Sequence, residues 1–181
     1  MTTYCDYCNS HPEDTFNKDY HDTQYGFPLD DDNLLFERLV LEINQAGLSW
    51  ITILKKADNF RKAYRKFDIA KVAKFTEKDR ARLLADAGII RNKLKVNAAI
   101  VNAQKILELK KEYGSFKGWL DAHHSLTKDE WTKLFKRTFF FTGGEIVNEF
   151  LMSTGYLQGA HVKSCPTYKK VAALRPAWMH K

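Results

Sequence analysis

Residues 30–56 read DDDNLLFERLVLEINQAGLSWITILKK, and this stretch decides the fold class. The acidic run 30–32 favours a helix N-terminus, and the large aliphatic side chains that follow recur at helical spacing as far as Gly47. A second helix is predicted to begin near Ser49. The stretch therefore predicts two consecutive helices joined by a short turn.

Helical periodicity extends outward from this stretch over nearly every long segment, which predicts an all-α protein. The further predicted helical segments are a short amphipathic piece at 60–67, a helix that starts at the capping box of Thr76 and Asp79 and ends at Gly88 as a left-handed residue, a helix over 92–112, one after Ser115, one opened by the capping box of Thr127 and Glu130, and one over 146–152 closed by Gly155. The run 139–141 is too short and isolated to make a sheet.

The composition predicts one unit over residues 1–181 that is not membrane-bound. The chain has 181 residues, of which 44% are hydrophobic, enough for one sizeable core. No apolar run approaches the roughly 18–20 residues that span a bilayer, and no secretory leader opens the chain. Three cysteines are too few, and odd in number, for a disulfide framework, so we expect a reducing, cytoplasmic compartment.

The charges are unevenly distributed along the chain. The formal net charge is +7, yet residues 1–50 carry two basic and ten acidic side chains, while residues 51–181 carry 27 basic and 12 acidic ones. An acidic first part on a basic remainder indicates a polyanionic partner such as nucleic acid for the basic part.

Cysteine and histidine residues lie near both ends of the chain at spacings typical of zinc half-sites. One group is Cys5, Cys8, His11 and His21, and the other is His161 with Cys165. Tetrahedral zinc needs four ligands, so a complete site would join the two ends and be structural. The spacing leaves open which of the first four residues would bind, and also whether the pattern arises by chance.

Glu42 lies in line with the apolar stripe of the first predicted helix. Such a carboxylate is either half-exposed and paired, or buried with a raised pKa at a functional site. Several aromatic residues occur near it in the sequence, namely Tyr4, Tyr7, Tyr20, Tyr25 and Trp50. Aromatic rings of this kind fill cores, but together with a carboxylate they can also hold a flat cationic heterocycle.

A helical hairpin is predicted over residues 83–103, with a turn at 88–91. Its second helix opens with basic side chains, Lys93 and Lys95, and with backbone N–H groups that can bind phosphate without reading base sequence. The alternative is an ordinary hairpin whose basic face is only solvated.

Four motifs give the chain a specific resemblance to a known family: Tyr20-His21-Asp22, the acidic run 30–32, the block from Leu41 to Lys56, and Asp86-Ala87-Gly88-Ile89-Ile90-Arg91. The chain resembles the 3-methyladenine DNA glycosylases of the bacterial type I family, helix-hairpin-helix enzymes of base-excision repair. The likeness runs from Cys5 to Cys165, nearly the whole length.

The resemblance implies a fold and a set of roles. The expected fold is an all-α glycosylase with a hairpin at about 77–111, in which zinc joins the terminal segments 1–25 and 156–170. The implied zinc ligands are Cys5, His21, His161 and Cys165, with Cys8 and His11 not involved. The implied base pocket has Glu42 as the catalytic acidic residue, Tyr20 as a second contact and Trp50 as the stacking ring, with Tyr25 and Tyr7 in or beside it. The implied DNA anchor is the hairpin turn, for which Gly88, Ile90, Arg91 and Lys93 are the candidate residues.

The implied activity is hydrolysis of the N-glycosidic bond of 3-methyladenine in alkylated double-stranded DNA, with the free base as product and a monomer as the working unit. Methylation makes the base cationic, so extrusion and discrimination remain the enzyme's main tasks, and a deprotonated Glu42 would favour the cation. No Asp is nominated as a catalytic residue and no Schiff-base lysine is expected.

Some positions depart from the family pattern. Tyr7 and Tyr25 stand where the family usually has tryptophan, Asn148 stands in place of tyrosine, Gly159-Ala160 replace Asn-Asp, and the segment 119–126 is short. These changes affect the expected damage specificity. Two alternatives follow, a family member with altered alkylbase specificity and a non-catalytic zinc-stapled module that binds DNA.

Overall fold

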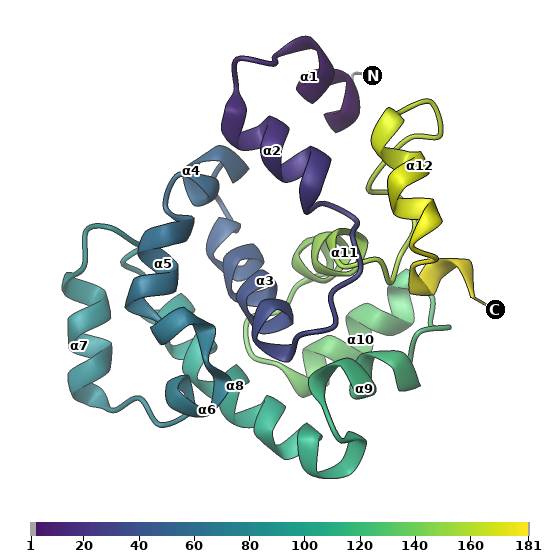
Figure 1. Cartoon of the computed structure of the whole chain (residues 1–181). Coiled ribbons are helices and arrows are strands. Elements are labelled where there is room, and N and C mark those ends of the chain that lie inside the picture. Colours follow the sequence, from purple (N-terminus) through teal and green to yellow (C-terminus); the bar gives the residue numbers. More distant parts are fainter. Residues whose placement is uncertain (1–2, 181) are drawn as a thin grey trace.

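The computed structural model describes residues 3–180, which fold into helices and turns with no strand among them (Figure 1). The helices are α1 Tyr4–Ser10, α2 Thr15–Thr23, α3 Asp32–Gln45, α4 Trp50–Leu54, α5 Ala57–Ala63, η1 Arg65–Phe67, α6 Ile69–Val72, α7 Glu77–Ala85, α8 Lys93–Tyr113, α9 Phe116–Ala122, α10 Lys128–Thr138, α11 Gly144–Ser153, α12 Pro166–Ala173 and η2 Ala177–Met179. The predicted all-α fold is confirmed for these residues.

Helix α3 forms the centre of the molecule, and other helices surround it on several sides (Figure 1). Ten consecutive residues, 35–44, are buried, including the polar residues Glu37, Arg38, Glu42 and Asn44. An amphipathic surface helix buries only one stripe, so this all-round burial goes beyond what the sequence pattern predicts. The central position of α3 is what brings charged side chains into the interior.

Side-chain caps begin several helices where the sequence predicts them. The Asp31 carboxylate accepts hydrogen bonds from the Asn33 and Leu34 backbone N–H groups at the start of α3. Asp32 instead caps a different helix: its two carboxylate oxygens each accept a backbone N–H at the start of α9, both at 3.0 Å. The acidic run therefore organises two helix N-termini, one of them distant in sequence.

One prediction about an element was wrong. Helix α7 ends at Ala85, three residues before Gly88, and Gly88 does not adopt a positive φ. Here the Asp86 carboxylate accepts from the Gly88 N–H at 2.8 Å, so an aspartate side chain forms the turn that a left-handed glycine was expected to form. The pattern also did not predict α1, α2 or α12, which are short and lie near the chain ends.

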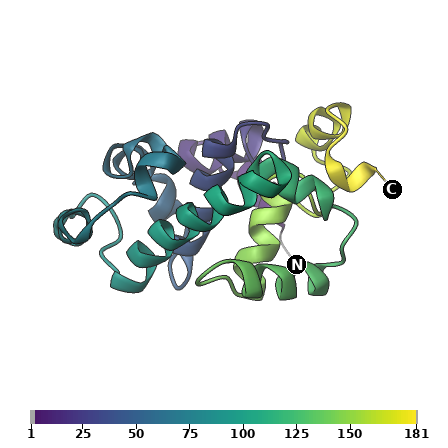
Figure 2. The ribbon, with the colours of Figure 1, turned by 90° about the horizontal axis from the view of Figure 1, so that it is seen from below.

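The view from below shows an elongated molecule, with α7 and α12 at opposite ends and the long helix α8 running between them (Figure 2). The first helices, α1 and α2, lie close to the loop that leads into α12 (Figure 1). Among the described residues, no helix combines the length and the apolar character that crossing a bilayer requires.

Candidate functional site

A pocket of about 400 Å³ lies between the N-terminal helices, α3 and α11. Its lining residues are Tyr4, Tyr20, Tyr25, Glu42, Gln45, Trp50, Glu145 and Glu149. Three aromatic pairs enclose it, with ring centroids 5.1 Å apart for Tyr20 and Trp50, 5.6 Å for Tyr20 and Tyr25, and 5.5 Å for Tyr4 and Tyr25. Rings in this arrangement leave π-faces and edges to contact a flat ligand.

Glu42 projects from α3 into this pocket and is 4% exposed. Among residues 3–180, no side chain hydrogen-bonds to its carboxylate. Burial raises the pKa of Glu42 to about 8; Arg38 acts to lower the pKa, and Glu149 raises it further. Of the two possibilities left open by the sequence, the buried one is correct. At pH 7 this raised pKa favours the protonated form of the Glu42 carboxyl group.

A buried arginine, Arg38, holds the Tyr20 side chain in place. The Arg38 guanidinium donates to the Tyr20 hydroxyl at 3.2 Å and to the Ser153 carbonyl at 3.3 Å. It also lies 5.1 Å from the centroid of the Tyr20 ring. Because the hydroxyl oxygen accepts from Arg38, its own proton is available for a ligand in the pocket.

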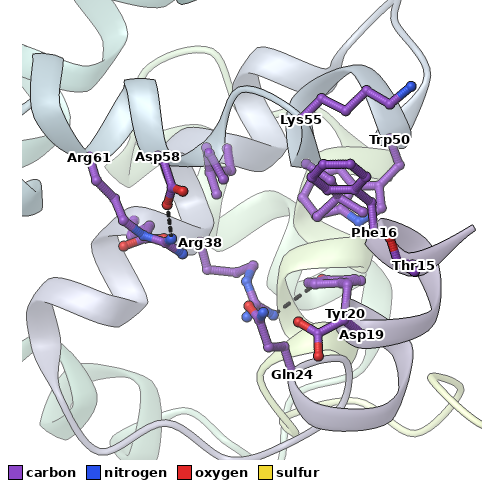
Figure 3. Close-up of a pocket in the computed structure, with 14 residues that line it drawn as sticks. Thr15, Phe16, Asp19, Tyr20, Gln24, Arg38, Trp50, Lys55, Asp58 and Arg61 are labelled. Carbon is purple, nitrogen blue, oxygen red and sulfur yellow. Dashed lines mark hydrogen bonds and ion pairs between the residues drawn. The ribbon is translucent and has the colours of Figure 1, made fainter.

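A second cavity, of about 540 Å³, adjoins the first, and Tyr20 and Trp50 line both cavities (Figure 3). Three of its charged groups are paired with each other. Arg61 contacts Glu37 at 2.7 Å and Asp58 at 2.9 Å, and Arg38 points toward Tyr20. The aromatic pocket, with an unpaired buried acid, is therefore the better candidate for a functional site.

Four residues of the pocket were not predicted as site residues from the sequence: Tyr4, Gln45, Glu145 and Glu149. Glu149 on α11 accepts a hydrogen bond from the Tyr25 hydroxyl at 3.0 Å, and burial raises its pKa. A charged residue inside the apolar stretch 146–152 was the available signal. Tyr4 was noted only as one of several upstream aromatic residues.

Tyr7 is the one predicted base-contact residue that the structure does not bring to the pocket. It is 37% exposed, stacks on His11 with centroids 4.5 Å apart, and donates from its hydroxyl to Asp14 at 2.9 Å. It lies on α1 three residues after Tyr4, and Tyr4 is the residue of that helix that lines the pocket.

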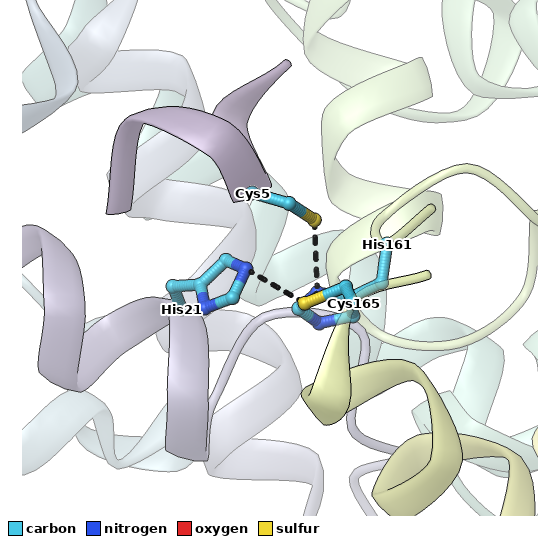
Figure 4. A group of neighbouring side chains, drawn as sticks. All are labelled: Cys5, His21, His161 and Cys165. Carbon is cyan, nitrogen blue, oxygen red and sulfur yellow. Dashed lines mark hydrogen bonds between the residues drawn. The ribbon is translucent and has the colours of Figure 1, made fainter. Parts of the chain in front are cut away.

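Figure 4 shows a second cluster, of cysteine and histidine residues. It lies beside the pocket, because the rings of His21 and His161 lie 5.6 and 5.7 Å from those of Tyr4 and Tyr25. Cys5 comes from α1, His21 from α2, His161 from the loop after α11, and Cys165 from the N-cap of α12. All four are buried, and one potential ligand atom from each lies within 4.8 Å of the others. Cys8 is outside the cluster and contacts the Asn17 carbonyl at 3.7 Å.

The geometry of this cluster fits tetrahedral zinc. Cys5 Sγ lies 3.6 Å from His161 Nδ1, and Cys165 Sγ lies 3.6 Å from His21 Nε2. With Zn–S near 2.3 Å and Zn–N near 2.1 Å, a tetrahedron separates sulfur from nitrogen by roughly 3.6 Å. The outer nitrogens are also engaged, His21 Nδ1 with Asp22 at 2.6 Å and His161 Nε2 with the Tyr25 carbonyl at 2.7 Å. Such contacts orient the inner nitrogens as ligands.

The α7–α8 turn presents only part of its predicted binding groups. Arg91 and Lys93 are exposed and Ile90 is half-buried, while the neighbouring Ile89 anchors the turn in the core. Two backbone N–H groups at the start of α8, expected to be free for phosphate, are capped by Asn92.

Lys95 is buried and does not belong to the exposed basic face predicted for the hairpin. Its ammonium group donates to the carbonyls of Asn44 at 2.8 Å and Ala46 at 2.6 Å, at the C-terminal end of α3. It thereby ties the hairpin to the helix that carries Glu42.

The chain has clear similarities to characterised proteins. Residues 9–134 match the family model described as Methyladenine glycosylase. The chain is 35% identical to the DNA-3-methyladenine glycosylase of Haemophilus influenzae, covering 92% of this chain and 98% of the relative. It is 38% identical to DNA-3-methyladenine glycosylase 1 of Escherichia coli, covering 82% and 89%.

The fold of the chain is also similar to solved structures. A structure on 3-methyladenine recognition by 3-methyladenine DNA glycosylase I from Staphylococcus aureus superposes with a TM-score of 0.81 at 32% identity, covering 91% of this chain and 97% of that one. A variant of 3-methyladenine DNA glycosylase I in complex with 3-methyladenine also gives 0.81 at 32% identity, over 88% and 96%.

Proposed function

The chain belongs to the methyladenine glycosylase family, and from that membership we propose that it removes 3-methyladenine from alkylated DNA by hydrolysing the N-glycosidic bond. It is a glycosylase, a hydrolase acting on N-glycosyl bonds, and its place is in DNA repair. The observation that carries the proposal is the buried Glu42 carboxyl group, unpaired among the described residues, in a pocket of aromatic rings.

Base recognition follows from the chemistry of this pocket. The damaged nucleotide must leave the duplex, at a cost of a few kcal/mol, and its base then stacks against Trp50 and Tyr20. A 3-methyladenine base in DNA carries a positive charge, while adenine is neutral. Bringing the cation next to Glu42 favours the ionised carboxylate, so binding releases the Glu42 proton, and the resulting charge pair favours the damaged base.

Bond cleavage then needs little acid catalysis, because the cationic base is already a good leaving group. The bond between N9 and C1′ breaks, and its electron pair stays on the base, which leaves neutral. A water oxygen bonds to C1′ and releases a proton to solvent. Glu42 faces the charged base before cleavage, and the Tyr20 hydroxyl, held by Arg38, donates to it. We expect a monofunctional enzyme that does not cut the strand.

The DNA duplex is held in this proposal by the α7–α8 turn. Arg91 and Lys93 contact phosphates. The backbone at Gly88 and the half-buried side chain of Ile90 lie close to the DNA strand. The contact of Lys95 with the end of α3 supports this arrangement, because it keeps the turn in fixed relation to the base pocket.

The cluster of Cys5, His21, His161 and Cys165 is assigned to a structural zinc ion. Four protein ligands leave no open position for a substrate, so the ion supplies folding free energy and no chemistry. It would join segments 1–25 and 156–170, making residues 1–181 one functional unit that acts as a monomer.

A base-release assay tests the proposed function. Double-stranded DNA methylated with a labelled methyl donor is incubated with the protein, and the released bases are separated. The wild-type chain releases 3-methyladenine, whereas Glu42→Gln, which keeps the size but cannot carry charge, lowers the rate by about a hundredfold or more. Glu112→Gln, an exposed position on α8, is the matched control and retains full activity. Absence of base release by the wild type would refute the proposal.

A further inference from the structure

One basic segment of the chain has no role in the function proposed above. Six of the twelve residues from 55 to 66 are lysine or arginine, and only Asp58 is acidic. The segment begins directly after α4, includes α5 and extends into the turn η1. A dense run of positive charge on a surface is either solvated or binds a polyanion, and its contacts decide between the two.

The groove beside α5 shows which of these cations is already neutralised. It has a volume of about 670 Å³, and its lining includes two acidic residues, Glu37 and Asp58. Both are paired with Arg61, at 2.7 Å and 2.9 Å. Arg61 is therefore the cation that satisfies the acids of the groove.

The other three cations of the groove, Lys62, Arg65 and Lys66, carry positive charge that nothing balances locally. All three are exposed, and none forms an ion pair or a side-chain hydrogen bond with another residue in the range 3–180. These three residues are called the α5–η1 patch. Unpaired cations spread over five residues of chain match a partner with repeated negative charge, such as the phosphates of a nucleic acid.

The backbone of η1 holds two of these cations in a conformation that has an energetic cost. Arg65, Lys66 and Phe67 have φ angles of 54°, 57° and 54°, in the left-handed region that favours glycine. Phe67 keeps the turn in place, because it is fully buried and stacks on Tyr64 with ring centroids 5.5 Å apart. Glycine would fit this turn without strain, so arginine and lysine at these positions indicate a use for their side chains.

The α5–η1 patch is continuous with the α7–α8 turn. At the other end of α5, the Lys56 ammonium group donates to the Ala87 carbonyl at 3.1 Å, and the Asn59 side-chain amide donates to the Gly88 carbonyl at 3.3 Å. Helix α5 has seven residues and is therefore about 10 Å long, equivalent to about three base-pair steps of a duplex. The turn and the patch are thus separated by a distance that one duplex can span.

We propose that the α5–η1 patch is a second DNA-binding surface, which contacts backbone phosphates of the duplex beside those held by the α7–α8 turn. This inference rests on the glycosylase function proposed above. Phosphate contacts carry no sequence information, so the patch raises the affinity for damaged and undamaged DNA alike. It thereby keeps the enzyme on DNA between lesions, while the base pocket selects the base.

The test compares two variants that lose the same positive charge at different places. The patch variant combines Lys62→Ala, Arg65→Ala and Lys66→Gly. Its control loses three exposed lysines in and before α12, at the opposite end of the molecule from α7 (Figure 2): Lys163→Ala, Lys169→Ala and Lys170→Ala. Fluorescence anisotropy measures the affinity of each variant for an unmethylated duplex over a series of salt concentrations.

The patch variant is expected to bind the duplex about tenfold more weakly than the wild type, or worse. Its slope of log affinity against log salt concentration becomes shallower by about 1 for each lost phosphate contact, and so by up to about 3. The control variant has the same net charge and keeps the wild-type slope. Equal affinity and slope in the patch variant and the wild type would show that the patch is only solvated, and the inference would be wrong.

A single substitution separates lost phosphate contacts from damage to the fold. Lys66→Gly removes one cation and also relieves the positive φ, so it weakens DNA binding without lowering the urea midpoint of unfolding. A lower midpoint with unchanged DNA binding would show that Lys66 serves only the fold, and would overturn the inference. Release of 3-methyladenine by the wild type is measured separately: if it occurs, the proposed function stands even where the patch fails, and if it does not, the proposed function itself is refuted.

Discussion

Glu42 is an acid that the fold keeps away from water without giving it a partner among the described side chains, and this has a measurable effect on stability. Its pKa is about 8 in the folded protein, compared with an ordinary value near 4.5. Between these values the folded state binds a proton that the unfolded state has lost. The contribution of Glu42 to the free energy of unfolding therefore falls as pH rises from about 5 to about 8.

We expect Glu42→Gln to be increasingly more stable than the wild type over this pH range. Their difference in unfolding free energy should grow by up to about 1.4 kcal/mol per pH unit and become constant above about pH 8. Urea denaturation at pH 5, 7 and 9 measures it, with Glu112→Gln as a control whose difference stays constant. A pH-independent difference for Glu42→Gln would show that the carboxyl group is not held protonated.

At the scale of single residues, the sequence identified part of the candidate pocket. Glu42, Tyr20, Tyr25 and Trp50 lie together in the structure. The position of Glu42 on the apolar stripe was informative because α3 is buried on all sides. Glu149 is a charged residue inside an apolar stretch, but this local signal does not place it beside Glu42. Its place in the pocket depends on α11 packing against α3, a long-range contact.

The N-terminus of helix α9 is capped by Asp32, a residue that the sequence pattern assigns to the start of α3. Asp32 begins α3 in the sequence, but its carboxylate caps α9 and lies 3.0 Å from the Lys110 ammonium group. We expect Asp32→Ala to lower the free energy of unfolding by about 1–2 kcal/mol. Asp30→Ala, where the side chain is 91% exposed, should change it by less than about 0.5 kcal/mol. Equal effects of the two variants, measured by urea denaturation, would contradict the assigned cap.

The α7–α8 turn makes a separate prediction for DNA binding. Exposed cations that contact phosphate release counterions, so Arg91→Ala combined with Lys93→Ala should weaken binding to any duplex sequence to a similar extent. The slope of log affinity against log salt concentration should become shallower by about 1 per lost contact. Lys169→Ala, an exposed lysine on α12, is the control and should leave the slope unchanged. Fluorescence anisotropy with duplexes of two unrelated sequences provides the measurement.

The helices were predicted best where side-chain caps mark their ends. Asp31, Asn92, Ser115 and Thr127 each accept a backbone N–H at the start of a helix, as their positions in the sequence indicate. The helices α1, α2 and α12 are seven to nine residues long, which is too short for periodicity to be distinctive. The formation of these three helices depends on their packing and on the cysteine–histidine cluster, which involves residues near both ends of the chain.

For the whole molecule, the assigned zinc ion predicts a link between metal content and folding. Elemental analysis should find about one zinc per chain, and removal by a chelator should lower the thermal midpoint by several degrees or more. Cys165→Ser should lose the metal, whereas Cys8→Ser, an equally buried thiol outside the cluster, should retain it. A Cys165→Ser chain that keeps both zinc and thermal midpoint would contradict the assignment.

The distribution of charge also has a meaning at this scale. The acidic first part of the chain contributes Glu42 to the pocket and Asp31 and Asp32 to helix caps, while the exposed cations Arg91 and Lys93 belong to the basic remainder. The net charge of +7 therefore combines two parts of opposite sign with different tasks.

The pocket is built from two segments that are far apart in the sequence, 4–50 and 145–149, and this determines when it can form during synthesis. Tyr4, Tyr20 and Trp50 leave the ribosome early, but Glu149 and the Ser153 carbonyl, which accepts from Arg38 and Gly26, follow about a hundred residues later. The pocket is therefore incomplete until α11 has been synthesised and has packed against the earlier helices. A nascent chain, or one truncated before α11, therefore has no complete base pocket and cannot act on DNA before α11 has been synthesised.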